Sequence, residues 1–414
     1  MARANIVTRG ATLHPSNIKY INNDKTRGIK YDWKAIRKAY NHIPIPDGYF
    51  DPTRLPFETA KYLIEYSRRG TGKTTNLLML GLVLYYLYGT HTIYVRQIAD
   101  NIAPKNAKDM YGIIQSWHYI EHITQGRWNS ITYNAKRWYL CNVDEVGQII
   151  EVDSDHCCFM CDVANGSDLK SSFNDPMGDF IIYDEFISAD GSYIPNEFVL
   201  FCDLLSTIIR QRYSPVIMLV ANNIDKEHPF FYEMECAHIV HAQKPGDHMT
   251  MTTEKGTDIY IEYYSPEAEY DKSRNVLEAM NKLFFGFKNK KLGAITGEDW
   301  AITPAQHIPA DKADLVLVSN NLYIMAHDKL VKLDIIVHPV LGMCVYIHWA
   351  TKTYDDSVIL TTEPRFDRRY MYGFGEGRLE RLLMKLAKEN RFYYASNDIA
   401  SFVRAYINGI PATL

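Results

Sequence analysis

Two patterns of apolar and polar residues organise the first 265 residues. Short runs rich in β-branched and aromatic residues predict buried strands, and longer apolar stretches of helix-forming residues lie between them. The expected strands are residues 61–66, 93–96, 180–185 and 214–220. The expected helices are residues 76–88 and 198–212, the second with apolar residues three or four positions apart. Strands that alternate with helices predict an α/β domain with a mostly parallel sheet.

The pattern changes in the last third of the chain. After Pro309, alternating residues predict several strands between 315 and 348, and helical spacing returns at 377–390 and 397–408. Strands followed by helices predict a compact α+β domain. We therefore expect four parts, which are a basic N-terminal extension (1–41), an α/β domain (42–265), a small lid or linker (266–308) and an α+β domain (309–414).

Composition places the chain among ordinary soluble proteins. It has 414 residues, of which 47% are apolar and 23% charged. The longest apolar run, Leu77 to Tyr88, is too short to span a bilayer, and we expect no signal peptide before it. Seven scattered Cys favour a reducing compartment over a disulfide framework. His156-Cys157-Cys158 with Cys161 lacks a second ligand pair, so a buried strand edge is favoured there over a zinc site.

Basic residues gather in three places although the net charge is only −4. Residues 1–40 hold nine Lys and Arg against two Asp, and this arm either contacts nucleic acid or an acidic partner or is a solvated extension. The other two clusters are residues 288–291, which closely follow aromatic residues, and residues 365–370, which mix cations with aromatic residues. Both compositions are suited to phosphate contacts.

A glycine-rich basic loop joins the first expected strand to the first expected helix. In such a loop Gly70 and Gly72 let backbone N–H groups converge on phosphate oxygens, Lys73 reaches the β and γ phosphates, and Thr74 offers a hydroxyl to Mg²⁺. Ser67 stands where the usual pattern has its first glycine. The strand, loop, helix order favours a phosphate-binding loop over a surface turn. Its residues are Ser67, Arg68, Arg69, Gly70, Thr71, Gly72, Lys73, Thr74 and Thr75.

Acidic and polar residues end the two later strands of this domain. Asp184 is suited to bind Mg²⁺ together with Thr74, and Glu185 to orient and deprotonate a water molecule, which favours hydrolysis over transfer to a substrate. Asn222 is our candidate for sensing the γ-phosphate or that water, the alternative being a cap or turn former. The pair Asp184-Glu185 ends the strand 180–185, and the residues after Asn222 lack the Lys of the motif with which GTPases read guanine. Both observations favour ATP over GTP.

Arginines provide further candidate charges. Arg69 within the loop can act on phosphate in its own subunit. Arg210 and Arg212 follow the helix 198–212, where they either complement the helix C-terminus or reach a neighbouring subunit's site.

These blocks resemble the DNA-packaging ATPases of phi29-like tailed phages. The longest block runs from Tyr183-Asp184-Glu185-Phe186-Ile187 through Tyr193-Ile194-Pro195-Asn196-Glu197 to Arg210-Gln211-Arg212. The loop Arg69 to Thr74, the strand 93–96 and Asn222 followed by Pro229-Phe230-Phe231 fit in the same order. The resemblance is good over about 60–232 and weaker beyond.

The resemblance implies an ATP- and Mg²⁺-dependent ring motor, a homopentamer in that family, on the portal of an empty capsid. It would drive double-stranded DNA inward, in the host cytoplasm, and a structural RNA is a further possible partner. Carried over by position, Lys73 and Thr74 bind nucleotide and Mg²⁺, Asp184 and Glu185 are the metal-binding and catalytic carboxylates, and Arg210 is the trans-acting arginine finger.

The resemblance also implies a fold for each domain. We expect a P-loop NTPase domain of the additional-strand, catalytic-Glu (ASCE) type, followed by an RNase H-like domain. A nuclease needs about three converging carboxylates. Asp328, Asp334, Asp355 and Asp356 do not fall on the expected central strands, which favours a degenerate, nucleic-acid-binding domain. The rival function is a P-loop switch or AAA-like remodeller that acts on a protein, and a third is a nuclease.

Overall fold

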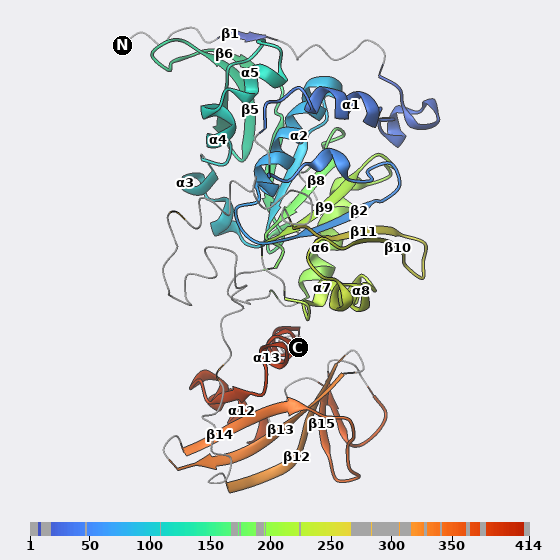
Figure 1. Cartoon of the computed structure of the whole chain (residues 1–414), viewed down its shortest axis with the longest axis vertical. Coiled ribbons are helices and arrows are strands. Elements are labelled where there is room, and N and C mark those ends of the chain that lie inside the picture. Colours follow the sequence, from blue (N-terminus) through green and yellow to red (C-terminus); the bar gives the residue numbers. More distant parts are fainter. Residues whose placement is uncertain are drawn as a thin grey trace. The chain divides into compact units, whose positions relative to one another are not determined.

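The structure is a computed structural model that divides into two units (Figure 1). The first unit comprises Met1–Ile187, Val199–Asn223 and Ala242–Trp300, and the second Ser188–Phe198, Ile224–His241 and Ala301–Leu414. The described residues are 7–9 (backbone), 18–45, 48–107, 109–166, 173, 175–187, 194, 196–222, 225–265, 283, 306, 316–326, 329–339, 342–361, 365–372 and 378–409.

The described strands of the first unit form one sheet with a parallel centre. In spatial order this centre is β7 (Cys158–Asp162), β3 (Thr92–Arg96), β8 (Phe180–Asp184), β9 (Val216–Ala221), β2 (Tyr62–Tyr66) and β11 (Asp258–Tyr263). Strand β2 precedes the phosphate loop, and strand β8 ends in the candidate carboxylate Asp184. β9 lies between these two strands in the sheet. That additional strand confirms the expected ASCE-type P-loop fold.

Antiparallel strands extend both edges of the parallel centre. β10 (His248–Thr252) pairs with β11, and β5 (Arg137–Val143) pairs with β7, β4 (Ser130–Asn134) and β6 (Ile149–Asp153). β1 (Val7–Arg9) lies parallel to β6. Several of these strands carry exposed or half-buried residues, so they lack the strong apolar signal of the central strands.

Helix α2 (Lys73–Tyr88) begins directly at the phosphate loop. Gly72 and Gly89 flank it with φ angles of 77° and 71°, left-handed conformations that glycine adopts without steric cost. Residues Asn76 to Tyr85 are buried without a break, because the helix lies between the sheet and other helices. The expected helix 76–88 is thus confirmed, three residues longer at its start.

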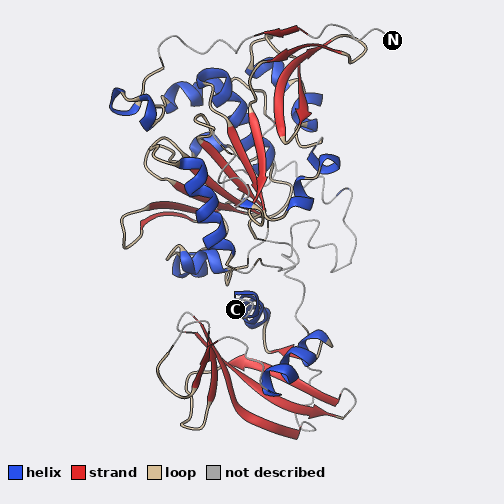
Figure 2. Cartoon of the chain, turned by 180° about the vertical axis from the view of Figure 1, so that it is seen from behind, coloured by secondary structure: helices blue, strands red, loops and turns tan. Residues whose placement is uncertain are grey.

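Helices α2 and α6 (Glu197–Ile209) cover opposite faces of the sheet (Figures 1 and 2). Ile182 of β8 belongs to the core cluster that contains α2, whereas the ring of Tyr183 packs against Phe201 of α6 with centroids 4.9 Å apart. Successive side chains of a strand point to opposite faces, so β8 is buried on both sides.

Part of the expected basic extension packs into the first unit. Trp33, Ile36 and Tyr40 of α1 (Trp33–Tyr40) are buried in the same core as α2, and the Trp33 ring stacks on Phe57 at 4.4 Å. The short helices α3 (Pro104–Ala107), α4 (Gly112–Ser116) and α5 (Tyr119–Ile123) follow β3.

The second unit contains a mixed six-stranded sheet among its described residues. In spatial order it is β16 (Tyr370–Tyr372), β15 (Val358–Thr361), β12 (Val316–Ala326), β13 (Lys329–His338), β14 (Gly342–Trp349) and β17 (Phe392–Tyr394). β12, β13 and β14 form an antiparallel meander, and β15 and β16 add in parallel beside β12. This strand arrangement is that of an RNase H-like sheet, as expected.

Helices complete the second unit. α12 (Arg378–Lys388) and α13 (Asn397–Gly409) contribute Leu383, Leu386 and Phe402 to the core of the sheet. The unit also takes in α7 (Pro229–Glu233) and most of α8 (Ala237–Ala242).

Several expected features lie outside the described residues. They are most of the lid or linker (266–308), the basic cluster 288–291 and Asp328. No helix in the described part of the chain is both long and apolar enough to cross a membrane.

Candidate nucleotide site

The phosphate loop is shaped by two left-handed glycines. Gly70 and Gly72 have φ angles of 81° and 77°, and a Cβ atom on Gly72 would lie 2.6 Å from Cδ1 of Tyr49. A larger residue is therefore excluded at Gly72 by both backbone and space. The loop is anchored where it leaves β2, since the Ser67 N–H donates to the carbonyl of Ala221 over 3.2 Å.

Lys73 lies with its ammonium folded into the loop. It is 3% exposed and donates to the hydroxyls of Ser67 and Thr71 (3.2 Å for Thr71) and to the carbonyl of Arg68 (3.4 Å). Ser67 is therefore more than a small turn residue, because its hydroxyl holds the lysine. Burial lowers the pKa of Lys73 to about 8, although the carboxylates of Glu65, Asp184 and Glu185 oppose this effect.

This lowered pKa predicts that nucleotide binding takes up a proton in mildly alkaline solution. Above about pH 8 the free protein holds Lys73 largely neutral, and a bound polyphosphate favours its charged form. We expect affinity to fall as pH rises through this range, with proton uptake measurable by calorimetry in buffers of different ionisation enthalpy. Lys73→Arg keeps a permanent cation and should lose the uptake; equal uptake in that variant would assign the proton to another group.

Asp184 ends β8 beside the start of α2. Its Oδ2 accepts hydrogen bonds from the hydroxyls of Thr74 (3.0 Å) and Tyr94 (2.5 Å). Burial raises the pKa of Asp184, and the guanidinium of Arg96 opposes that rise. Hydroxyl and carboxylate oxygens are the ligands that Mg²⁺ prefers, so Thr74 and Asp184 fit a magnesium ion at this point.

Glu185 adopts a conformation that is uncommon for a residue with a side chain. Its φ angle is 53°, in the left-handed region, and its N–H donates to Oδ1 of Asp184 over 3.0 Å. One carboxylate oxygen pairs with Arg96, and the other accepts from the side-chain amide of Asn222 over 3.4 Å. The structure thus brings Asn222 and Glu185 together, and strained residues of this kind cluster at functional sites.

The sequence reasoning missed two residues that hold this pair of acids. Arg96, the last residue of β3, forms ion pairs with Glu185 and, at 3.7 Å, with Asp184, while Tyr94 donates to Asp184 from the same strand. The contacts of Arg96 and Tyr94 with the two acids follow from strand order, because β3 lies directly beside β8 and the carboxyl ends of both strands meet at one edge of the sheet. The available signal was a basic residue at the tip of a neighbouring strand.

The candidate arginines lie in different places. Arg69 is exposed on the loop and Arg68 is half-buried beside it. Arg210 is exposed after the end of α6 and donates to the carbonyls of Phe173 (2.6 Å) and Thr207 (3.4 Å). Since α6 connects the parallel strands β8 and β9, its end lies at the edge of the sheet opposite to the phosphate loop.

Arg212 has a structural position. Its guanidinium forms an ion pair with Asp179 at 2.8 Å and donates to the carbonyls of Asp175, Gly178 and Ile208. Both partners of this ion pair are almost fully buried. Of the two arginines after α6, only Arg210 is therefore placed to meet another molecule.

The second unit shows separate partners for its candidate carboxylates. The expectation that no candidate acid lies on a central strand is wrong for Asp334, because it lies on β13 in the middle of the sheet. There it pairs with Lys332 at 3.1 Å and His348 at 3.0 Å, while Asp356 accepts from Asn321 at 2.5 Å. Arg365 and Arg368 are exposed in the basic cluster before β16, next to the fully exposed ring of Phe366.

Comparison with known proteins gives distant structural likenesses. No family model and no curated protein matches the chain. The Phi-28 gp11 DNA packaging motor is similar over 89% of this chain and 99% of its own, at 14% identity and a TM-score of 0.49. The bacteriophage Phi-29 viral genome packaging motor assembly is similar over 86% of this chain and 97% of its own, at 14% identity and a TM-score of 0.49. The Thermus phage P74-26 large terminase ATPase domain is similar over 69% of this chain and 100% of its own, at 11% identity and a TM-score of 0.33. Phage packaging motors, which the sequence motifs resemble, and a large terminase ATPase domain are thus among the solved structures similar to this chain.

Proposed function

We propose that this chain is an ATPase that hydrolyses ATP at the loop 67–75. The observation that carries the proposal is the convergence of the loop lysine, the Thr74–Asp184 pair and the Glu185–Asn222 pair at one edge of the sheet. A cation, two hard oxygen ligands and a carboxylate beside an amide are the set that phosphoanhydride hydrolysis requires.

Each residue then has a separate role. Lys73 and the N–H groups of the loop would bind the phosphates, and Thr74 and Asp184 would hold Mg²⁺, which would neutralise charge on the phosphate oxygens. Glu185 accepts the proton of the attacking water, with Asn222 orienting it. Arg96 neutralises both acids and fixes their side chains at the strand ends.

Arg210 supports assembly into a ring. Its position at the far edge of its own sheet keeps it from its own nucleotide, so it acts on the phosphate of the next subunit. The ring would be a homopentamer, as in the family that the sequence resembles.

The work that this ring performs would be DNA packaging. We infer that it moves double-stranded DNA through the portal of an empty capsid in the host cytoplasm, with the second unit contacting nucleic acid through exposed cations such as Arg365 and Arg368. A packaging RNA would be a further partner. The sequence resemblance supports this function over a remodeller of proteins, which would need the same nucleotide site.

DNA dependence tests the function. We expect double-stranded DNA with empty capsids to raise the ATP turnover of the full-length protein, and the stimulation to fall steeply between about 50 and 200 mM salt as phosphate contacts are screened. Turnover that ignores DNA and capsids but responds to a protein partner would support the remodeller. Magnesium-dependent cutting of DNA would instead identify a nuclease.

A further inference from the structure

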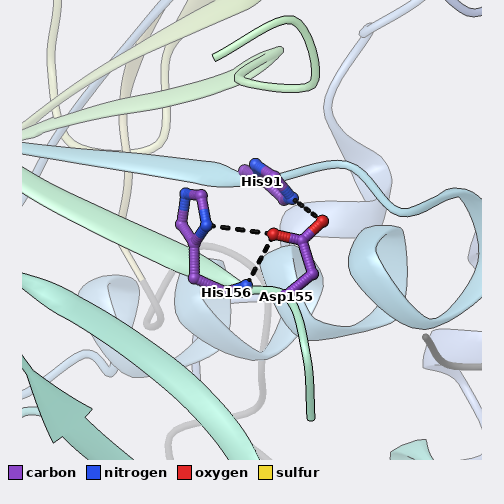
Figure 3. Close-up of side chains that lie close together, drawn as sticks. All are labelled: His91, Asp155 and His156. Carbon is purple, nitrogen blue, oxygen red and sulfur yellow. Dashed lines mark hydrogen bonds and ion pairs between the residues drawn. The ribbon is translucent and has the colours of Figure 1, made fainter. Parts of the chain in front are cut away.

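A second cluster of reactive side chains lies at the opposite edge of the sheet from the phosphate loop. His91 directly precedes β3, while Asp155 and His156 lie just before β7 (Figure 3). Asp175 lies a few residues before β8. Among the residues that the structure describes, His91, Asp155 and His156 are the one group of three whose ligand atoms converge, all within 4.8 Å.

The backbone fixes these residues in place. The N–H of His91 donates to the carbonyl of Met177 over 2.8 Å, and the hydroxyl of Tyr85 donates to the carbonyl of Asp155 over 3.2 Å. The N–H of Met177 in turn donates to Oδ1 of Asp175 over 3.0 Å. The cluster is therefore built into the sheet rather than formed by mobile surface side chains.

Each imidazole meets a carboxylate at both ring nitrogens. His91 Nδ1 lies 2.8 Å from Asp175 and its Nε2 lies 3.2 Å from Asp155. His156 Nε2 lies 3.1 Å from Asp175 and its Nδ1 lies 3.1 Å from Asp155. A neutral imidazole has one N–H, so it can donate to only one of its two acids.

Asp175 decides which nitrogen carries that proton. If both rings donate to Asp175, the lone pairs of His91 Nε2 and His156 Nδ1 face Asp155 together. Three acceptors would then converge with only the backbone N–H of His156 donating to Asp155, over 2.8 Å, and two further protons or one divalent cation would satisfy the remaining lone pairs.

One divalent cation can take the place of two protons in the cluster. The two rings are 4.1 Å apart between centroids and His91 is 4% exposed, so both imidazoles lie close enough to share one ion in a largely buried place. One divalent ion supplies the same charge and bonds all three acceptors. The side chain of Asp155 is 47% exposed, which gives the ion an entry path and room for a water ligand.

The ligand set identifies the class of metal. Ligands about 2.0–2.1 Å from a tetrahedral ion lie about 3.3 Å apart. The two imidazole–carboxylate separations, 3.2 Å from His91 to Oδ2 and 3.1 Å from His156 to Oδ1 of Asp155, are close to that value, so both carboxylate oxygens would face the ion. Two imidazoles and one carboxylate suit Zn²⁺ or Co²⁺, whereas Mg²⁺ and Ca²⁺ prefer oxygen ligands. An acid placed against the outer nitrogens, as Asp175 is, is the usual second partner of metal-bound histidines.

We propose that His91, Asp155 and His156 form a Zn²⁺-type site, with Asp175 as the positioning residue that orients both rings. The ion ties together the beginnings of β3, β7 and β8, whose other ends include Arg96 and Asp184 of the nucleotide site. It also restrains the segment around Asp175, whose backbone accepts from Arg212 while nearby Phe173 accepts from Arg210.

Metal content and unfolding temperature test the site without nucleotide. Full-length untagged protein is stripped with a chelator, freed of it, and titrated with Zn²⁺ in excess Mg²⁺. We expect one tight Zn²⁺ per chain, and an unfolding temperature raised by about 5 °C or more when Zn²⁺ exceeds its dissociation constant about 100-fold. Co²⁺ should give the visible absorption of a tetrahedral site.

Substitutions test whether Zn²⁺ binds at this cluster or elsewhere on the protein. We expect His156→Gln and Asp155→Asn to abolish the stoichiometric Zn²⁺, Asp175→Asn to weaken it about 10- to 100-fold, and His118→Gln, on the exposed start of α5, to leave it unchanged. Each variant is checked for folding by circular dichroism before titration. No tight Zn²⁺ on the unaltered protein, or equal binding by folded His156→Gln and Asp155→Asn proteins, would overturn the proposal.

Discussion

Glu185→Gln is expected to keep ATP binding and to lower ATP turnover by about 10²- to 10⁴-fold. The amide has the size of the carboxylate but cannot accept a proton from water at neutral pH. Binding should persist because Lys73, Thr74 and Asp184, which contact the nucleotide and its metal, are unchanged. Turnover is measured by phosphate release, and affinity by titration with a fluorescent ATP analogue.

A surface glutamate provides the matched control. Glu145 is exposed in the turn between β5 and β6, so Glu145→Gln makes the same chemical change away from the site. We expect it to leave both turnover and affinity unchanged. If Glu185→Gln kept full turnover, the base would have to be another residue, and the left-handed conformation of Glu185 would need a different explanation.

Arg210→Ala is expected to lower turnover by about 10³- to 10⁵-fold in the assembled ring, the usual size of an arginine finger's effect. Because the arginine acts on the next subunit, the loss should be partly restored by mixing. A ring that combines Arg210→Ala subunits with Glu185→Gln subunits contains interfaces where an intact Arg210 faces an intact Glu185. We expect turnover in the mixture above that of either variant alone.

Arg212→Ala is the control that distinguishes an arginine finger at Arg210 from a structural arginine. Removing Arg212 leaves the carboxylate of Asp179 buried without its cation, which costs about 3–5 kcal/mol of folding stability. We expect a lower unfolding temperature and no rescue by mixing. Mixed rings that contain both Arg210→Ala and Glu185→Gln subunits, yet show no gain, would remove the trans role of Arg210.

Local sequence was enough to predict the centre of the first unit. β8 and β9 are buried on both faces, so they have short continuous apolar runs, β2 has one interrupted only by the buried Glu65, and α2 has a long one. The glycines of the phosphate loop and the acids after β8 lie next to these runs in sequence. Their meeting at one edge then follows from parallel pairing alone.

Features that depend on long-range pairing could not be predicted in this way. The role of Arg96 depends on β3 lying beside β8, and the cluster of His91, His156 and Asp175 depends on three separate strands beginning at one edge. His156 was considered only with the cysteines that follow it, yet in the fold its partners come from 65 residues earlier and 19 later. A local motif search has no access to such partners.

The N-terminal segment shows the same limit. Its many cations suggested a separate extension, but three buried residues of α1 place residues 33–40 in the main core. A short amphipathic helix needs a surface to pack against, and charge counts alone do not reveal one.

ATP hydrolysis by the purified full-length protein tests the central claim most directly. We expect phosphate release that requires Mg²⁺, stops with EDTA and is lost in Lys73→Ala, which removes the ammonium from the loop without altering the acids at the ends of β8. Hydrolysis that survives in Lys73→Ala, or no hydrolysis by the unaltered chain with Mg²⁺, double-stranded DNA and empty capsids all present, would contradict the account.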